Sequence, residues 1–258
     1  MTPDPTADLP PRPWYIAAAL VAAVVLGVFG AAFVGWSYWR QQPEVSQLHL
    51  TERGEQKDVE LPDGTRLTLD ASTRLEVLLY RTRRVVRVST GQVLFDVPND
   101  GRPFDVAAGP LRLATDGARF ALRHTPRVDK DPRGHVAVRD GTVQVSLRGL
   151  DATVAAGEQL TSDADGRLGA VTPVAADAIA PWRLGRVTFT AAPLADVLAE
   201  FERYGPTGLV PADPAVGALP VTGTFDPRRP DALRQALPDL LPVMLVDRDR
   251  FTEVTARP

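Results

Sequence analysis

The sequence predicts a membrane-anchored protein with a large all-β domain and, after it, a small α+β module. Three observations support this fold class. An uncharged apolar stretch lies near the start, apolar residues then alternate with polar ones over residues 51–172, and helical spacing appears only after residue 181. The chain has 258 residues, which is room for this arrangement of domains.

The predicted anchor is the segment Trp14–Trp36, which contains no charged residue. As a helix it would be roughly 35 Å long, enough to cross the hydrocarbon core of a bilayer. Tryptophan at both ends suits the two headgroup interfaces, so membrane lipid is an expected partner. A signal peptide would have a shorter apolar region, and a buried core helix would have a polar stripe. We expect the proline-rich residues 1–13 to be disordered, because proline lacks the amide hydrogen that a helix needs. We place this tail in the cytoplasm, because so short a segment leaves little to translocate.

Three glycines, Gly27, Gly30 and Gly35, lie in the half of the anchor that faces away from the N-terminus. Glycine weakens a helix, which would help an intramembrane protease to unwind this segment. Gly27, Ala31 and Gly35 also place small side chains four apart, as in closely packed helix pairs. The sequence leaves these two interpretations open.

Residues 37–50 are polar and are interpreted as a juxtamembrane linker, and residues 51–172 show the two-residue period of β-strands. Four glycines recur between the alternating runs at intervals of 24 to 27 residues, and we predict that they mark turns. The predicted turn residues are Asp63, Gly64, Gly91, Gly117, Asp140 and Gly141. Such regularity favours a β-roll of stacked hairpins, with a β-sandwich as the alternative.

Residues 173–181 are rich in alanine and proline, and we predict a linker there, followed by a module over residues 182–258. Its predicted order is β-α-β-β-α-β-β. A helix opening at Pro193 would place one apolar face inward. The predicted core of the module consists of Trp182, Phe189, Leu194, Val197, Leu198, Phe201 and Phe225.

Composition argues against most chemistry. The net charge of −3 gives no reason to expect nucleic-acid binding, and the absence of cysteine excludes disulfides and thiolate sites. His124 and His135 flank a loop with Asp129 and Asp131, but their spacing fits no standard metal site. No phosphate-binding loop, dinucleotide motif or nucleophile elbow occurs. We therefore expect no catalytic, metal or cofactor residues, and no enzyme.

One basic cluster stands out in the β-rich region, with arginines at positions 81, 83, 84 and 87. The favoured interpretation is the solvated face of a strand. A docking surface is the alternative.

Several blocks of the sequence resemble FecR-type transmembrane sensors. VELPDGTRLTL at Val59–Leu69, followed by Asp70-Ala71-Ser72, is similar to the opening motif of that family. The blocks that continue the resemblance are Gly91–Val97, Val136–Val145, Ala156–Gln159, Trp182–Tyr204 and Val221–Phe225. They cover nearly all of the chain after the predicted anchor, in the family's order and spacing.

This resemblance implies an anti-sigma regulator in the bacterial inner membrane, with a cytoplasmic N-terminus and a periplasmic bulk. Such proteins relay a signal, by protein contact, from the signalling domain of a TonB-dependent outer-membrane receptor to an extracytoplasmic-function sigma factor. The receptors in question carry iron chelates. The C-terminal module is similar to the short domains of secretins and TonB-dependent receptors, and we expect it to face the receptor.

The family's cytoplasmic helical domain, which holds the sigma factor, has no counterpart in residues 1–13. We expect either that the true start lies upstream or that this is a truncated member that senses without sequestering. The alternative function is a membrane-tethered β-rich scaffold or binding module without sigma-factor control.

Overall fold

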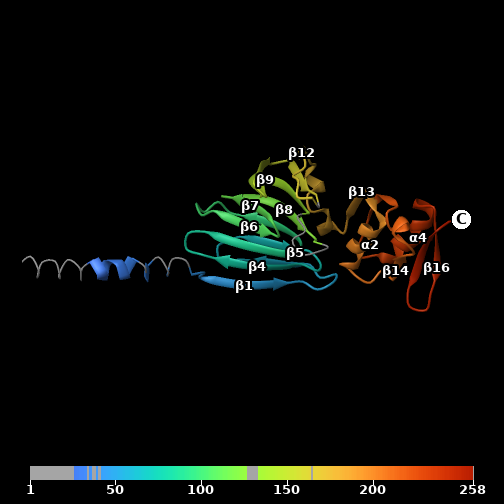
Figure 1. The fold of residues 1–258 in the computed structure, drawn as a ribbon, viewed down its shortest axis with the longest axis horizontal. Helices are drawn as coiled ribbons and strands as arrows, with labels where there is room; N and C mark the ends of the chain where they lie inside the picture. The colour runs from blue at the N-terminus through green and yellow to red at the C-terminus, as the bar shows by residue number, and fades with distance from the viewer. Residues whose placement is uncertain are drawn as a thin grey trace, which may run out of the picture. The chain divides into compact units, whose positions relative to one another are not determined.

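The computed structural model describes residues 26–33, 35–36, 39, 42–126, 133–163 and 165–257. The chain divides into two compact units, residues 1–43 and residues 44–258. Each is described by itself, and the second contains all the strands shown in Figure 1.

In the first unit, residues 26–33 and 35–36 are helical and their side chains are exposed. Leu26 and Phe29 have exposed fractions of 72% and 71%. The rest of the predicted anchor Trp14–Trp36, and the predicted tail over residues 1–13, lie outside the described residues. Within the part of the chain that the structure describes, no helix has the length and apolar character needed to cross a membrane.

The β-domain, residues 44–173, contains twelve strands among its described residues. They are β1 (Val45–Leu50), β2 (Lys57–Glu60), β3 (Arg66–Leu69), β4 (Arg74–Leu79), β5 (Arg84–Val97), β6 (Phe104–Ala108), β7 (Leu111–Thr115), β8 (Ala118–His124), β9 (Gly134–Leu147), β10 (Leu150–Ala155), β11 (Glu158–Ser162) and β12 (Thr172–Pro173).

Two long strands, β5 and β9, each belong to two sheets. Sheet I runs β1-β4-β5-β6-β7-β9-β10, and sheet II runs β2-β3-β5-β8-β9-β11-β12. Their pairings are antiparallel except that of β5 with β6. Strands β5, β6, β7, β9 and β8 pair in a closed ring, which makes a small barrel. The predicted β-rich fold is confirmed, in the form of two sheets that share strands rather than stacked hairpins.

The core of the β-domain lies between the two sheets. Alternate residues of each strand point inward, so that Phe95 and Phe120 stack with ring centroids 4.8 Å apart. Other fully buried members include Leu67, Leu75, Phe104, Leu122 and Leu147.

Two of the predicted turns are not turns. Asp63 and Gly64 lie between β2 and β3, and Gly117 lies between β7 and β8, but Gly91 is inside β5 and Asp140-Gly141 is inside β9. Both glycines have positive φ and sit next to a shift in the strand register. They mark the places where a long strand leaves one sheet and enters the other. A turn and a β-bulge both favour glycine at positive φ, so the sequence alone does not distinguish them.

The predicted juxtamembrane linker, residues 37–50, contains a strand. Residues 45–50 form β1, which pairs with β4 from Val45↔Leu79 to Leu50↔Arg74. Val45 packs against the β-domain core, whereas Leu48 and Leu50 are 54% and 50% exposed on the other face of this edge strand.

The C-terminal module follows a connector, residues 174–181, which includes the 3-10 helix η1 (Ala176–Ala178). Its elements are η2 (Pro181–Leu184), β13 (Val187–Pro193), α2 (Leu194–Glu202), β14 (Leu209–Pro211), α3 (Pro214–Gly217), β15 (Pro220–Phe225), α4 (Pro230–Leu240), β16 (Val243–Asp247) and β17 (Thr252–Ala256). Strands β13 and β15 form one sheet, and β14-β17-β16 form another, with β14 parallel to β17. The short helix α3 was not predicted.

The helices α2 and α4 contact the strands of the module around a second core. Of the predicted core residues, Phe225 is half-buried, and Trp182, Phe189, Leu194, Val197, Leu198 and Phe201 are buried. The same cluster includes Leu94, Ala121 and Ala137, which point away from the β-domain core on the outer face of sheet II. The module therefore packs on that face.

Candidate functional site

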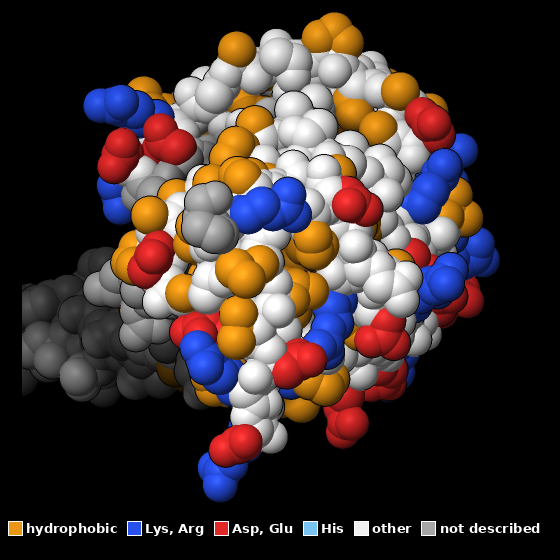
Figure 2. Space-filling model, turned by 90° about the vertical axis from the view of Figure 1, so that its right-hand side faces the viewer, with side chains coloured by type: hydrophobic (Ala, Val, Ile, Leu, Met, Phe, Trp, Pro, Cys, Tyr) orange, Lys and Arg blue, Asp and Glu red, His pale blue; other side chains and the backbone are white. Residues whose placement is uncertain are grey.

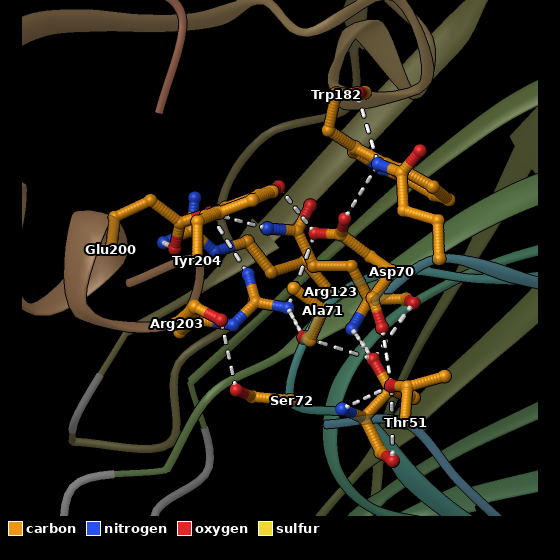
Figure 3. A network of polar contacts seen from close by, with 12 residues as sticks. Thr51, Asp70, Ala71, Ser72, Arg123, Trp182, Glu200, Arg203 and Tyr204 are labelled. Atoms are coloured by element: carbon orange, nitrogen blue, oxygen red, sulfur yellow. Dashed lines mark hydrogen bonds and ion pairs between the residues drawn. The ribbon is translucent and has the colours of Figure 1, made fainter. Parts of the chain in front are cut away.

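The contact between the module and the β-domain contains a network of buried charged and polar side chains (Figure 3). One half of the network is the loop after β3, where Asp70 is fully buried. The other half is the last turn of α2 and the two residues after it, which contribute Glu200, Arg203 and Tyr204. The two halves are more than 125 residues apart in the sequence.

Three donors converge on the carboxylate of Asp70. The Tyr204 hydroxyl donates to Oδ2 at 2.7 Å, and Arg203 Nη2 donates to the same atom at 3.2 Å. Gln56 Nε2 donates to Oδ1 at 3.0 Å, and also to the Trp182 carbonyl at 3.2 Å. This carboxylate is thus held by both the β-domain and the module.

The carboxylate of Glu200 is also almost completely buried, and it faces sheet II. Gln92 on β5 donates to Oε1 at 2.7 Å, and Arg123 on β8 donates to Oε2 at 2.8 Å. Arg203 Nη1 also donates to Oε1, at 2.9 Å. Arg203 therefore bridges the two buried carboxylates.

Backbone contacts fix the same region. The Arg203 carbonyl accepts hydrogen bonds from Ser72 Oγ at 3.0 Å and from the Gly54 amide at 3.1 Å. Arg203 Nη2 donates to the Ala71 carbonyl at 2.5 Å. Within the β-domain, Thr51 Oγ1 donates to the Asp70 carbonyl at 2.6 Å, which holds the loop that presents the carboxylate.

Burial sets the electrostatics of this network. Desolvation raises the pKa of Asp70, and the nearby Arg203 and the hydrogen bonds from Tyr204 and Gln56 oppose this rise. Burial and the Asp70 carboxylate raise the pKa of Tyr204 far above its usual range, so the phenol remains a neutral donor. Two carboxylates face two guanidinium groups, and this arrangement can hold the two surfaces together in one geometry.

The residues considered as metal ligands do not form a site in the part of the chain that is described. No group of three His, Cys, Asp or Glu there is placed to hold a metal ion. His124 Nδ1 lies 3.0 Å from the Arg133 carbonyl, and His135 Nε2 lies 2.9 Å from Gln159 Oε1. Asp129 and Asp131 lie outside the described residues.

The predicted arginine cluster is not a uniform solvated face. Arg87 is exposed and pairs with Glu76 at 3.1 Å, but the Arg84 side chain is fully buried. Arg84 contacts Asp63 at 3.4 Å and Asp100 at 3.3 Å, and its guanidinium lies 5.3 Å from the Phe104 ring centroid. This arginine joins the loops at one end of the barrel instead of facing solvent.

Sequence reasoning did not identify the network. In the sequence, Asp70, Glu200 and Arg203 belong only to blocks of the family resemblance. One signal was available, because Glu200 lies beside Val197 and Phe201 on the otherwise apolar side of the predicted helix. A carboxylate in such a position is rarely buried without a partner.

The comparisons with known proteins agree with the motifs. The family model described as "FecR protein" matches residues 47–144, from β1 into β9. A comparison with curated proteins finds no match.

Two crystal structures have a similar fold, and each is named as a "putative anti-sigma factor" from Parabacteroides distasonis ATCC 8503. The first is 22% identical with a TM-score of 0.72, and the match covers 82% of this chain and 99% of that one. The second is 23% identical with a TM-score of 0.71, and covers 81% and 99%. The predicted resemblance is thereby confirmed for residues 47–144, which form a FecR protein domain within a fold shared with these two structures.

Proposed function

We propose that this protein is a FecR-like regulator of a sigma factor that works by binding rather than by catalysis. The observation that carries the proposal is the family match over residues 47–144. The names of the two structures of similar fold support it. The finer proposal is that the chain relays a periplasmic signal from a TonB-dependent outer-membrane receptor to an extracytoplasmic-function sigma factor.

The proposed location is the bacterial inner membrane, with a cytoplasmic N-terminus and residues 44–258 in the periplasm. The exposed apolar side chains of the first unit support it, because exposed apolar side chains in such number are costly in water. Besides Leu26 and Phe29, Phe33 is 67% exposed, and Trp36 and Trp39 are each 52% exposed. The apolar sequence Trp14–Trp36 includes most of them.

The proposed receptor-binding element is strand β16 at the edge of the module. Among the described strands it pairs with β17 alone, so its other edge has no strand beside it. A backbone hydrogen bond closes the ladder at each end. The Arg257 amide donates to the Pro242 carbonyl, and the Arg248 amide donates to the Phe251 carbonyl. Because such pairs alternate in an antiparallel ladder, Leu245 directs its N–H and C=O away from β17.

The surroundings of this edge suit an extended partner segment. Met244 and Leu240 are each 43% exposed. Figure 2 shows the end of the molecule formed by the module, with exposed hydrophobic side chains among acidic and basic ones. An added strand would gain main-chain hydrogen bonds from the edge and specificity from these side chains.

A binding measurement tests the proposal. Residues 44–258 would be titrated with the purified signalling domain of an outer-membrane receptor from the same genome, by isothermal calorimetry. Leu245→Pro removes the outward N–H and should abolish binding, because proline cannot donate to an added strand. Leu245→Ala is the matched control, since it loses the same packing but keeps the N–H.

Equal binding by the two variants would overturn the assignment of β16. Failure of every receptor signalling domain to bind, together with unchanged sigma-dependent transcription after deletion of the gene, would favour the scaffold alternative instead.

A further inference from the structure

The network between Asp70 and the end of α2 joins two parts that each have a core. In the part of the chain that the structure describes, the β-domain core contains no residue of the module. Among the described residues, the module core receives Leu94, Ala121 and Ala137 alone from the β-domain, and two of these three are alanines. The apolar contribution to docking is therefore small compared with either core.

The rest of the contact between the module and the β-domain is made by charged and polar side chains, which water can solvate. Asp70, Glu200, Arg123 and Arg203 lose hydration when the module docks, and their mutual attraction only partly offsets that loss. On separation each of them becomes hydrated again. Such a contact defines one geometry closely while adding little to the free energy of docking.

The covalent connection also permits separation. The connector, residues 174–181, is attached to the β-domain by few backbone hydrogen bonds, such as that from Val174 N to the Gly157 carbonyl at 2.8 Å. Among the described strands, none of the β-domain pairs with a strand of the module. Movement of the module as a body would leave every strand ladder intact.

We propose that Asp70, Glu200, Arg203 and Tyr204 form a latch, which holds the module docked on sheet II and opens as a unit without unfolding either part. A partner that binds the undocked module would shift the population toward the open state, so the latch is a route by which binding at the module reaches the β-domain. This inference concerns the two parts of residues 44–258 and does not depend on the identity of the partner.

Native-state hydrogen exchange on residues 44–258 tests the latch in the unaltered sequence. The Gly54 amide reports opening directly, because it donates across the contact to the Arg203 carbonyl. The reference amides lie in the middle of β5 and in α2. If the latch opens as a unit, the Gly54 amide should exchange with a lower opening free energy than the amides of β5 and α2, which stay protected. Exchange of all three sets only through one common unfolding event would overturn the proposal.

Tyr204→Phe tests the network itself. The variant removes one donor from Asp70, which should raise the exchange rate of the Gly54 amide by about tenfold, the effect of one hydrogen bond of roughly 1.4 kcal/mol. The matched control is Arg234→Gln, which breaks an exposed ion pair with Asp247 inside the module and should leave the Gly54 rate unchanged. An unchanged rate in Tyr204→Phe would count against the latch.

Trp182 provides a second measurement, because it is the only tryptophan in residues 44–258 and is buried beside the contact. In a urea titration of Tyr204→Phe its emission should change at a lower urea concentration than the far-ultraviolet circular dichroism does, because the contact opens before either core unfolds. Loss of both signals together would mean that the module cannot remain folded undocked, and would overturn the proposal.

Discussion

At the scale of single residues, Arg84 shows how a charge can be part of a core. Its side chain is fully buried, and its guanidinium contacts Asp63, Asp100 and two loop carbonyls. By charge it belongs with the exposed Arg83 and Arg87. The two-residue period of β5 places it instead with the buried Val86 and Val88. The strand period therefore predicts an inward position at residue 84. Burial of an arginine there also requires partners from other loops, which the local sequence does not show.

Arg84→Met should destabilise the β-domain by about 3–5 kcal/mol, because it leaves the Asp63 carboxylate buried without its cation. Arg87→Met on the same strand is the control. Arg87 pairs with Glu76 at the surface, so its loss should change stability by less than about 0.5 kcal/mol. Urea unfolding of residues 44–258 measures both values. Equal effects would show that Arg84 has no special role.

At the scale of elements, β5 and β9 explain why part of the fold could be predicted and part could not. The alternating pattern identified their buried residues correctly, because side-chain periodicity is a local property. The glycines inside them were interpreted as turns, because positive φ is common to turns and bulges. Only the packing of distant residues decides between the two. At Gly91 that packing is supplied by Thr73, whose Cα would lie 2.6 Å from an added Cβ.

Gly91→Ala should therefore be more destabilising than the same change at a turn. Gly101 also has positive φ, at +81°, but an added Cβ there would have no neighbour within 4 Å. Gly101→Ala should cost about 1–2 kcal/mol through backbone strain alone. Gly91→Ala should cost roughly 1–3 kcal/mol more, because Thr73 must move. Thermal unfolding compares the two variants, and similar midpoints would contradict the role given to Gly91 at the crossing between sheets.

At the scale of the whole molecule, local patterns predicted the order of the strands and of the two longer helices in the module, but neither α3 nor the contact with the β-domain. The strands after residue 185 and the helices α2 and α4 follow from apolar spacing and from proline and glycine positions. The site depends on the approach of Asp70 to Tyr204, 134 residues later, for which a single sequence contains no periodic signal. The buried carboxylates are polar exceptions to an apolar pattern, and such exceptions are where sequence reasoning is expected to fail at a functional site.

The glycines of the first unit have two interpretations, which a single triple variant can separate. An added Cβ at Gly27, Gly30 or Gly35 meets no neighbour within 4 Å among the described residues, so a larger side chain at these positions begins in open space there. We expect the triple variant to stay in the membrane fraction after carbonate extraction, as the wild type should, whereas residues 44–258 alone should be released.

If the glycines serve an intramembrane protease, the N-terminal fragment should stop accumulating, because leucine stabilises each position by about 1 kcal/mol relative to glycine. If they serve helix packing, the fragment should persist and a crosslinked dimer should be lost instead. A variant that keeps both the fragment and the dimer would assign the glycines neither role.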